Sequence, residues 1–218
     1  MARRHDQQLA ADRAQALGPD HVSRETSKRL DRFVDLLLTW QESMNLIGPS
    51  TVGQVWTRHV ADSLQLLGLA PDARTWVDLG TGAGFPGLVI ACALAGTAGA
   101  KIHLVDKSPK KGAFLNAVVR ALDIPAVVHI ARIEDFVQNF GDSSDVVTAR
   151  ALAPLPRLLG YVAPFVEKGA QALLPKGQDV EAELTEASKC WNIQATLAPS
   201  RTDSRSRIVV VSRLERRR

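Results

Sequence analysis

The sequence predicts an α/β fold that is built on a mainly parallel sheet. After residue 74, short apolar segments alternate with helical segments, which is typical of parallel strands joined by crossover helices. A glycine-rich turn closes the first apolar segment, at the kind of position where such sheets bind ligands. With 218 residues, the chain is long enough for one sizeable core and too short for two domains of this type.

Residues 1–70 are predicted to form an N-terminal helical extension, a cap that packs on the sheet domain of residues 71–218. In the first half of this cap, apolar side chains recur at helical spacing, at Leu30, Phe33, Val34, Leu37 and Trp40. A second helix is expected over residues 55–67. His59 lies near the apolar stripe of this helix, so we interpret it as a core or capping histidine rather than a catalytic one.

Five parallel strands and an edge hairpin make up the predicted seven-stranded sheet. The parallel strands are expected at residues 75–79, 101–105, 126–130, 145–149 and 170–174. Helices are expected between them at residues 86–95, 110–122, 155–166 and 180–190. Residues 193–197 and 208–211 flank a polar turn, so they predict an antiparallel hairpin at the C-terminal edge.

The turn at residues 76–87, WVDLGTGAGFPG, carries the most functional information. Gly80, Gly82 and Gly84 permit positive φ angles and let a ligand approach the backbone. A helix follows directly, so its first free N–H groups point toward whatever lies over the glycines. This arrangement indicates a nucleotide-type binding turn.

Two ligands compete for this turn. Gly82, Gly84 and Gly87 fit the G-x-G-x-x-G pattern of dinucleotide sites, and Asp106 ends the next apolar strand. Asp78, however, places a carboxylate before the first glycine, where a dinucleotide site usually has an apolar residue. A carboxylate suits S-adenosylmethionine, because that ligand is cationic and has no pyrophosphate. We therefore favour S-adenosylmethionine over NAD; in the alternative, the two aspartates only cap the loop and end a strand.

Other candidate site residues follow the ends of neighbouring strands, which open on one edge of the sheet. Asp106 is expected to accept hydrogen bonds from ribose hydroxyls. Ile133 and Glu134 are expected to contact an adenine, and Phe85 to flank the cofactor. The guanidinium of Arg150 suits a methionine carboxylate or a guanine O6 atom, and the alternative is a surface arginine in an ion pair.

Composition excludes several classes of function. The longest apolar stretch is too short for a membrane span, and the start lacks the apolar core of a secretory signal, so we expect a cytoplasmic protein. Cys92 and Cys190 have no CxxC partner; we expect two buried, inert thiols and no metal site.

The formal net charge is +4. Lys107, Lys110 and Lys111 open a predicted helix, where positive charge is unfavourable; this indicates phosphate contact, and the alternative is a solvated helix start. Together with Lys176, Arg201, Arg205 and Arg207, these lysines are expected to form a basic rim that would give salt-sensitive affinity for a polyanionic partner.

The sequence resembles the bacterial small-subunit (16S) ribosomal RNA guanine-N7 methyltransferases of the glucose-inhibited division B family. The resemblance covers nearly the whole chain, through MNLIG, RHVADSL, VDLGTGAGFPG, VDKSPKK, RIEDF, VTARALAPL, LPKGQ and RSRIVVV. It implies a Rossmann-like class I S-adenosylmethionine-dependent methyltransferase that modifies ribosomal RNA. Because the basic rim is of modest size, we expect the RNA to be part of the small subunit or of an assembly intermediate, and we expect no obligate protein partner. The last motif departs from the DRNI-like run of many relatives, so the resemblance assigns no role to Arg205 or Arg207.

The resemblance also implies roles for individual residues. The residues expected from the resemblance to contact the cofactor are Gly80, Phe85, Ile133, Glu134 and Arg150. The strand-end pattern adds Asp78, Gly82, Gly84 and Asp106 to this set. Arg132, Arg150 and Lys176 are the expected catalytic residues, and Lys110, Lys111, Arg132 and Lys176 the expected RNA-binding residues.

The expected methyl transfer requires few catalytic groups. Guanine N7 carries a lone pair and no proton, so in-line methyl transfer requires positioning and no general base. Neither an N/D-P-P-Y/F loop nor a cysteine on a strand-end loop is present, which argues against amino-group and cytosine-C5 methylation. A small-molecule methyltransferase and a catalytically silent nucleotide- or RNA-binding protein are the alternatives.

Overall fold

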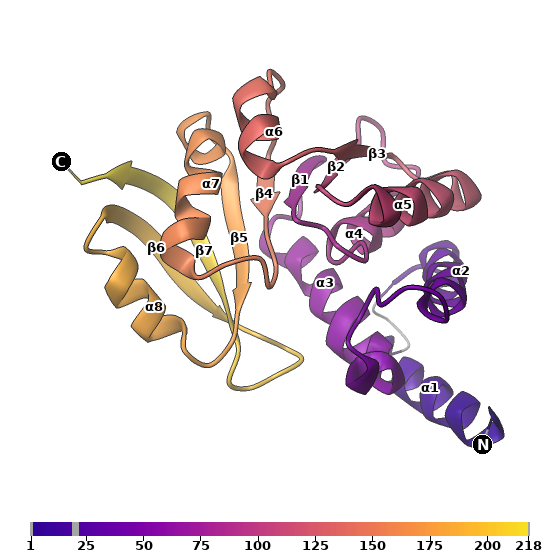
Figure 1. Cartoon of the computed structure of the whole chain (residues 1–218). Coiled ribbons are helices and arrows are strands. Elements are labelled where there is room, and N and C mark those ends of the chain that lie inside the picture. Colours follow the sequence, from indigo (N-terminus) through magenta and orange to yellow (C-terminus); the bar gives the residue numbers. More distant parts are fainter. Residues whose placement is uncertain (1, 19–21, 218) are drawn as a thin grey trace.

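The computed structural model describes residues 2–18 and 22–217, and side chains from residue 6 onward. Seven strands form one sheet in the order β3-β2-β1-β4-β5-β7-β6 (Figure 1). The strands are β1 (Thr75–Leu79), β2 (Lys101–Asp106), β3 (Ala126–Ile130), β4 (Val146–Thr148), β5 (Gln171–Lys176), β6 (Trp191–Pro199) and β7 (Arg207–Arg216). All pairs from β3 to β5 are parallel, whereas β7 is antiparallel to both β5 and β6. The predicted α/β fold with its antiparallel C-terminal edge is therefore confirmed.

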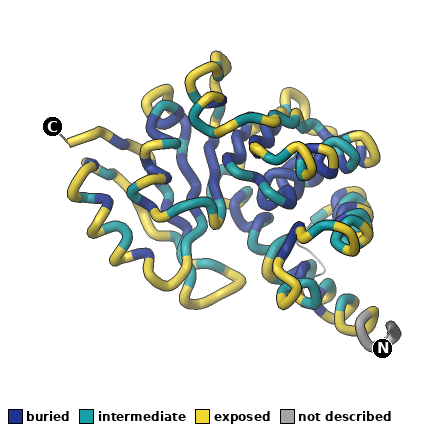
Figure 2. The backbone as a smooth tube through the Cα atoms, viewed as in Figure 1, coloured by how far each residue is buried: buried dark blue, intermediate teal, exposed yellow. Residues whose placement is uncertain are grey.

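Helices cover both faces of the sheet because side chains alternate in direction along each strand. The helices after β1 are α4 (Gly87–Leu94), α5 (Pro109–Leu122), α6 (Ile133–Asn139), α7 (Leu155–Glu167) and α8 (Val180–Ala187). One buried cluster joins α4 and α5 to the sheet, and a second joins α6, α7 and α8 to the opposite face. Figure 2 shows the central strands as buried and the connecting loops as largely exposed.

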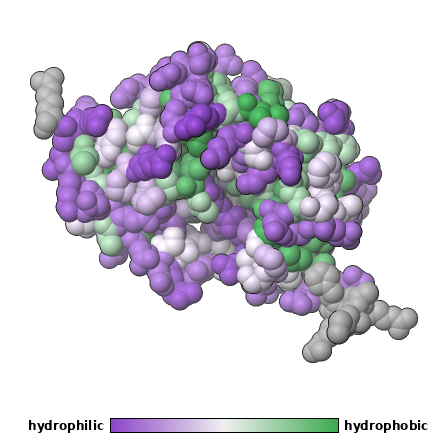
Figure 3. All heavy atoms as spheres, viewed as in Figure 1, coloured by the Kyte–Doolittle hydropathy of each residue, from purple (hydrophilic) through white to green (hydrophobic). Residues whose placement is uncertain are grey.

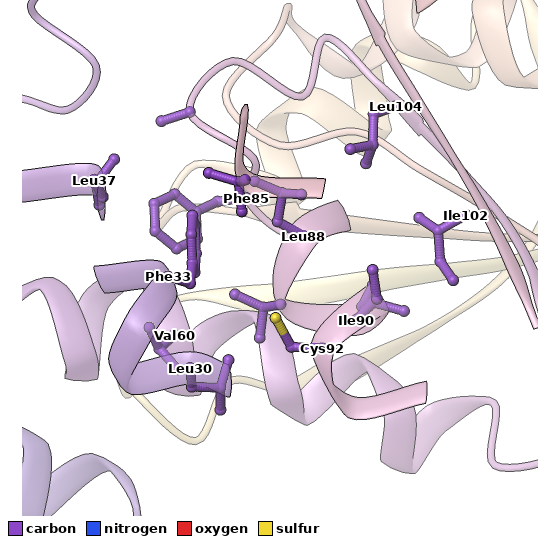
Figure 4. Close-up of a cluster of buried hydrophobic side chains, with 14 of the residues drawn as sticks. Leu30, Phe33, Leu37, Val60, Phe85, Leu88, Ile90, Cys92, Ile102 and Leu104 are labelled. Carbon is purple, nitrogen blue, oxygen red and sulfur yellow. The ribbon is translucent and has the colours of Figure 1, made fainter. Parts of the chain in front are cut away.

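The N-terminal helices are α1 (Ala2–Ala16) and α2 (Arg24–Gln41), followed by a 3-10 turn, η1 (Pro49–Gln54). Leu30, Phe33 and Leu37 of α2 pack in the same cluster as Leu88 and Ile90 of α4 (Figure 4). The cap thus shares its core with one face of the sheet. The division of the chain at residue 70 stays a prediction.

The predicted helix over residues 55–67 is irregular in the structure. It consists of a π-helical segment, η2 (Trp56–Ala61), then α3 (Asp62–Leu64), then a 3-10 segment, η3 (Gln65–Leu69). Asp12 of α1 accepts hydrogen bonds from the backbone N–H of Trp56 at 2.8 Å and from Thr57 Oγ1 at 2.6 Å, and so satisfies the start of this segment. π-Helical segments occur frequently at functional sites.

Three local predictions were wrong or incomplete. The sequence pattern did not predict α1, because its residues are polar and lack an apolar stripe; Asp12 and the Arg13–Asp31 ion pair hold it in place. Helix α6 was also missed, because it is short. Cys92 is buried as expected, but Cys190 is exposed, because α8 ends at Ala187 and Cys190 lies in the turn before β6. Among the described residues, no helix combines the length and the apolar composition that a membrane span requires.

Candidate functional site

The glycine turn adopts the conformation that its composition predicts. Gly80, Gly82 and Gly84 have φ angles of +72°, +58° and +89°, in the region that favours glycine. A Cβ atom on Gly80 would lie 2.7 Å from Cδ1 of Leu152, so this position also depends on the close approach of the loop after β4. Gly87 has no room for a Cβ atom either, because Oδ2 of Asp78 would be 2.7 Å away.

Asp78 lies beneath the turn and is 1% exposed. Its Oδ2 atom accepts a hydrogen bond from the backbone N–H of Gly87 at 2.9 Å, at the start of α4. Its Oδ1 atom is buried without a hydrogen-bond partner among the described residues, as is Oγ1 of Thr81. Burial raises the pKa of Asp78 to about 6, although the hydrogen bond from Gly87 opposes this shift. The carboxylate therefore organises the turn from below.

A cavity of about 450 Å³ lies at the carboxyl ends of β1 to β4, which we call the glycine-turn cavity. Strand order reverses between β1 and β4, so this is the switch point at which open α/β sheets bind ligands. The cavity brings together seven residues that the sequence analysis singled out: Gly80, Asp106, Lys107, Lys111, Arg132, Ile133 and Glu134. It also contains two residues that the sequence did not single out, Arg157 and Tyr161.

Asp106 is held by the backbone on both sides. Its Oδ2 atom accepts from the N–H of Gly82 at 3.1 Å, and its Oδ1 atom accepts from the N–H of Ser108 at 2.8 Å. Lys111 Nζ lies 3.9 Å from Oδ2 of the same carboxylate. Because each carboxylate oxygen has two acceptor sites, Asp106 keeps capacity for a ligand hydroxyl.

Glu134 forms the opposite wall of the glycine-turn cavity. Tyr161 of α7 donates a hydrogen bond to its Oε1 atom at 2.8 Å, and Arg157 donates in turn to the Tyr161 oxygen at 2.9 Å. Hydrogen bonds from its own backbone N–H and from Tyr161 lower the pKa of Glu134. Arg132, the residue before α6, is exposed, with Nε 3.9 Å from Oε2 of Glu134. No local pattern indicated Tyr161, because it comes from a helix that reads as a core element.

Arg150 follows β4 and is bound to the helical cap. Its Nε atom lies 3.1 Å from Oδ2 of Asp62, and its Nη2 atom donates to the carbonyl of Arg58 at 2.7 Å. Its Nη1 atom lies 3.0 Å from Nδ1 of His59. A guanidinium only donates, so Nδ1 of His59 is the acceptor and the ring carries its proton on Nε2, which is 3.0 Å from Oγ1 of Thr51. Arg150 thus forms the ion pair that the surface-arginine alternative expected, with its side chain 21% exposed, and it also lines two cavities.

His59 is a neutral structural residue in this arrangement. Burial lowers its pKa to about 3, and the positive charges of Arg150 and Arg58 act in the same direction. Its ring stacks on Phe85, with centroids 4.9 Å apart and an interplanar angle of 26°. Phe85 also contacts Phe33 of α2 and is only 7% exposed. The structure thus places Phe85 in the core beside His59, outside the wall of the glycine-turn cavity.

Lys176 lies at the end of β5 in a second cavity of about 370 Å³, the Lys176 cavity, which Arg150 also lines. Its Nζ atom is 2.7 Å from Oε2 of Glu183 and donates to the carbonyl of Ala153 at 3.2 Å. Oε2 of Glu183 also accepts from the N–H of Leu155 at 2.5 Å, where α7 begins. Glu183 therefore ties Lys176 to the loop after β4, a role that the sequence did not reveal.

The structure separates the predicted residues into groups. The glycine-turn cavity and the Lys176 cavity meet at Ala151, whose φ angle is +50°. Lys110 is exposed on α5 and lines none of the cavities described. Asp78 is buried below the turn, Gly82 lies beside Lys111, and Gly84 packs against Leu88.

A third and larger cavity, about 720 Å³, separates the β6–β7 loop from the N-terminal helices. We call it the cap cavity. It shares Asp62, Arg150 and Ser206 with the Lys176 cavity, so the three cavities follow one another across the molecule.

Comparisons with known proteins agree with this geometry. The model of the GidB family, described as rRNA small subunit methyltransferase G, matches residues 26–206. Ribosomal RNA small subunit methyltransferase G of Bradyrhizobium sp. strain BTAi1 is 55% identical over 208 residues, which cover 95% of this chain and 94% of that protein. The protein of the same name from Nitrobacter hamburgensis is 57% identical over 208 residues, which cover 95% of this chain and 80% of that protein.

Solved structures share the fold at low sequence identity. An O-methyltransferase from Bacillus cereus in complex with SAH superposes with a TM-score of 0.59 at 13% identity, covering 95% of this chain and 99% of that chain. A putative O-methyltransferase from Klebsiella pneumoniae has a TM-score of 0.59 at 10% identity, covering 95% and 98%. The sequence-based identification is confirmed: the chain has the class I S-adenosylmethionine-dependent methyltransferase fold and belongs to the GidB family of ribosomal RNA small subunit methyltransferases.

Proposed function

We propose that this protein transfers a methyl group from S-adenosylmethionine to N7 of a guanine in 16S ribosomal RNA. The observation that carries the proposal is the adjacency of two cavities at the carboxyl edge of the sheet. The glycine-turn cavity contains the carboxylates of Asp106 and Glu134 together with basic side chains, and the Lys176 cavity contains Arg150 and Lys176 together with acidic ones. Ala151 is common to both cavities. This adjacency provides one site for the cofactor and a neighbouring site for the base that receives the methyl group.

The glycine-turn cavity suits S-adenosylmethionine. Its volume of about 450 Å³ lies in the range of roughly 300–1,000 Å³ for small-molecule sites. Asp106 and Glu134 provide acceptors for ribose hydroxyls and an adenine amine, while Ile133 and Leu152 provide apolar walls. The absence of a side chain at Gly80 lets Leu152 approach and form this wall. When bound, the cofactor supplies an electrophilic methyl group on a positively charged sulfur.

No residue is required to remove a proton, because guanine N7 is unprotonated in neutral solution. The neutral His59 ring has both nitrogens engaged by Arg150 and Thr51, so it orients Arg150 and does not act as a base. A guanidinium has five N–H donors, and the contacts of Arg150 leave some of them for a guanine oxygen. We assign Arg150 to holding the base in line for transfer.

Lys176 is assigned to the same task. Its ammonium has three N–H donors, and Glu183 and the carbonyl of Ala153 occupy two of them. Lys110, Lys111 and Arg132 lie at the starts of α5 and α6, on the edge of the sheet where the cavities open. We assign these three to phosphate contacts, which makes RNA affinity depend on salt.

Two further points are proposals of finer detail. The RNA substrate is expected to be part of the small ribosomal subunit or of an assembly intermediate, since the basic surface is of modest size and needs additional contacts with the particle. The protein is expected to act in the cytoplasm and without an obligate protein partner.

The test is methyl transfer from tritiated S-adenosylmethionine to small subunits and to extracted 16S RNA, both from a strain that lacks the gene. We expect 7-methylguanosine by mass spectrometry. Asp106→Asn should raise the dissociation constant of the cofactor about tenfold, since charge-assisted hydrogen bonds contribute about 1.5 kcal/mol or more. Asp123→Asn is the matched control, because Asp123 is exposed at the end of α5 with a φ angle of +49° that asparagine tolerates.

The alternatives predict different results. Cofactor binding without incorporation into either RNA preparation would favour a small-molecule methyltransferase or a silent binding protein. A methylated nucleoside other than 7-methylguanosine would contradict the assignment of the reacting atom.

A further inference from the structure

We propose that the cap cavity binds a ribose-phosphate segment of the substrate RNA that flanks the target guanine. The cavity has a volume of about 720 Å³, which is larger than the glycine-turn cavity. Its lining residues come from the β6–β7 loop on one side and from the N-terminal helices on the other. Figure 1 shows where these two parts of the chain lie. The inference rests on the proposed function and adds a subsite to it.

The position of the cavity favours a continuation of the RNA chain. The glycine-turn cavity meets the Lys176 cavity at Ala151, and the Lys176 cavity meets the cap cavity at Asp62 and Arg150. A base that reaches the cofactor through the Lys176 cavity therefore leaves its neighbouring nucleotides next to the cap cavity. Only a polymeric substrate needs a site there.

The acidic groups of the cap cavity are all used within the protein. Asp12 accepts from Trp56 and Thr57, and Asp62 pairs with Arg150. Asp203 accepts from the backbone N–H of Arg205 at 2.9 Å and from Ser206 at 3.2 Å. The three negative charges of these aspartates are matched in number by Arg58, Arg150 and Arg205, which also line the cavity, so the cavity is not a net cation site.

Several donors of the cavity are uncommitted. Within the described residues, the side chains of Arg58, Gln15 and Gln54 make no hydrogen bond to another residue, and all three line the cavity. Arg58 is exposed and lies in the π-helical segment η2, whereas its carbonyl holds Arg150. The surface around the β6–β7 loop is mostly hydrophilic (Figure 3). Amide and guanidinium donors suit phosphate and ribose oxygens.

The chemistry of the wall favours the RNA backbone over its bases. No aromatic residue is among the described residues that line the cap cavity, so no platform for base stacking is present. Contacts should therefore be independent of sequence and dependent on salt. One wall belongs to α1, which precedes the residues 26–206 that the family model matches.

The test measures binding of 16S RNA, extracted from the strain that lacks the gene, between 50 and 200 mM salt. Arg58→Ala removes one phosphate contact and should reduce the slope of log affinity against log salt by about 0.7. Its affinity loss should then be about 2.6-fold larger at 50 mM than at 200 mM salt. Gln15→Lys adds a charge to the same wall and should steepen the slope by about 0.7. A folding defect would weaken RNA binding in both variants, whereas a direct phosphate contact changes the slope in opposite directions in Arg58→Ala and Gln15→Lys.

Arg216→Ala is the matched control. It removes one exposed arginine at the far end of β7, nine positions from Arg207 and thus about 30 Å along the strand. Its slope should equal that of the wild type, and cofactor affinity by calorimetry should be unchanged in all three variants. Unchanged slopes in Arg58→Ala and Gln15→Lys, with an active wild type, would overturn this inference alone. An equal change in Arg216→Ala would also overturn it, whereas an inactive wild type would overturn the proposed function.

Discussion

Arg150 Nη1 lies 3.0 Å from Nδ1 of His59, and this hydrogen bond joins the loop after β4 to the helical cap. The two residues are 91 positions apart in the sequence. Asp62 reinforces the connection at Arg150 Nε and also accepts a hydrogen bond from Thr202 Oγ1 of the β6–β7 loop at 2.8 Å. One segment of the cap thus positions two loops that border the candidate site.

His59 should make the stability of the protein depend on pH. Its pKa is about 3 in the folded protein, compared with 6.5 as the ordinary value, so the unfolded chain binds one more proton between these limits. The free energy of unfolding therefore rises with pH through this window. Above pH 6.5 the burial of His59 no longer lowers it, because the ring is neutral in both states. His59→Phe, which keeps a ring beside Phe85, should reduce the slope between pH 5 and 6 by up to about 1.4 kcal/mol per pH unit. Urea unfolding at several pH values measures it, and an unchanged slope would contradict the buried neutral ring.

Asp78 should show the opposite dependence. Its pKa is raised from 3.8 to about 6 in the folded protein, so the folded state binds more protons in this window and stability falls as pH rises through it. Asp78→Asn keeps an acceptor for Gly87 and removes the buried charge. We expect it to increase the free energy of unfolding at pH 7.5 by about 1–3 kcal/mol and to weaken cofactor binding, because a carboxylate below the turn favours a cationic ligand. A variant that is less stable at pH 7.5 than the wild type would refute this.

Glu183 should be a stability and positioning residue. Glu183→Ala removes the partner of Lys176 and the acceptor of Leu155 N–H, and the side chains of the pair are only 26% and 12% exposed. We expect a loss of about 2 kcal/mol or more in the free energy of unfolding. Glu186→Ala is the control on the same helix, since Glu186 pairs with Lys189 in a highly exposed ion pair and should leave the melting temperature nearly unchanged. Equal effects of the two substitutions would rule out the special role of Glu183.

The two cysteines should differ in reactivity. Cys92 is buried, and burial raises its pKa to about 12, whereas Cys190 is exposed. A chromogenic disulfide reagent should therefore titrate one thiol in the folded protein and two after unfolding in guanidinium chloride. Cys190→Ser should abolish the reaction of the folded protein. Two reactive thiols under native conditions would mean that α4 opens readily.

The sheet and the glycine turn were predictable because their signals are local. A segment of only five residues suffices to indicate a strand by its apolar pattern. The positive φ angles of the turn favour glycine, which the sequence has at Gly80, Gly82 and Gly84. Asp106 and Glu134 were found because strand ends meet at one edge of a parallel sheet. The prediction failed for α1, whose polar residues are ordered by the contacts of Asp12 with residues 44 and 45 positions away.

By itself, the sequence determined the fold class, the binding turn and the set of charged residues near it, because periodicity and glycine placement act over a few residues. Only the tertiary structure decided which partner each charge has. In the folded protein, Arg150 pairs with Asp62 and donates a hydrogen bond to His59, and Lys176 pairs with Glu183. The side chain of Arg58 lines the cap cavity without a hydrogen bond to another described residue. These pairings depend on distance and burial, and residues far apart in the sequence acquire both only when the chain is folded.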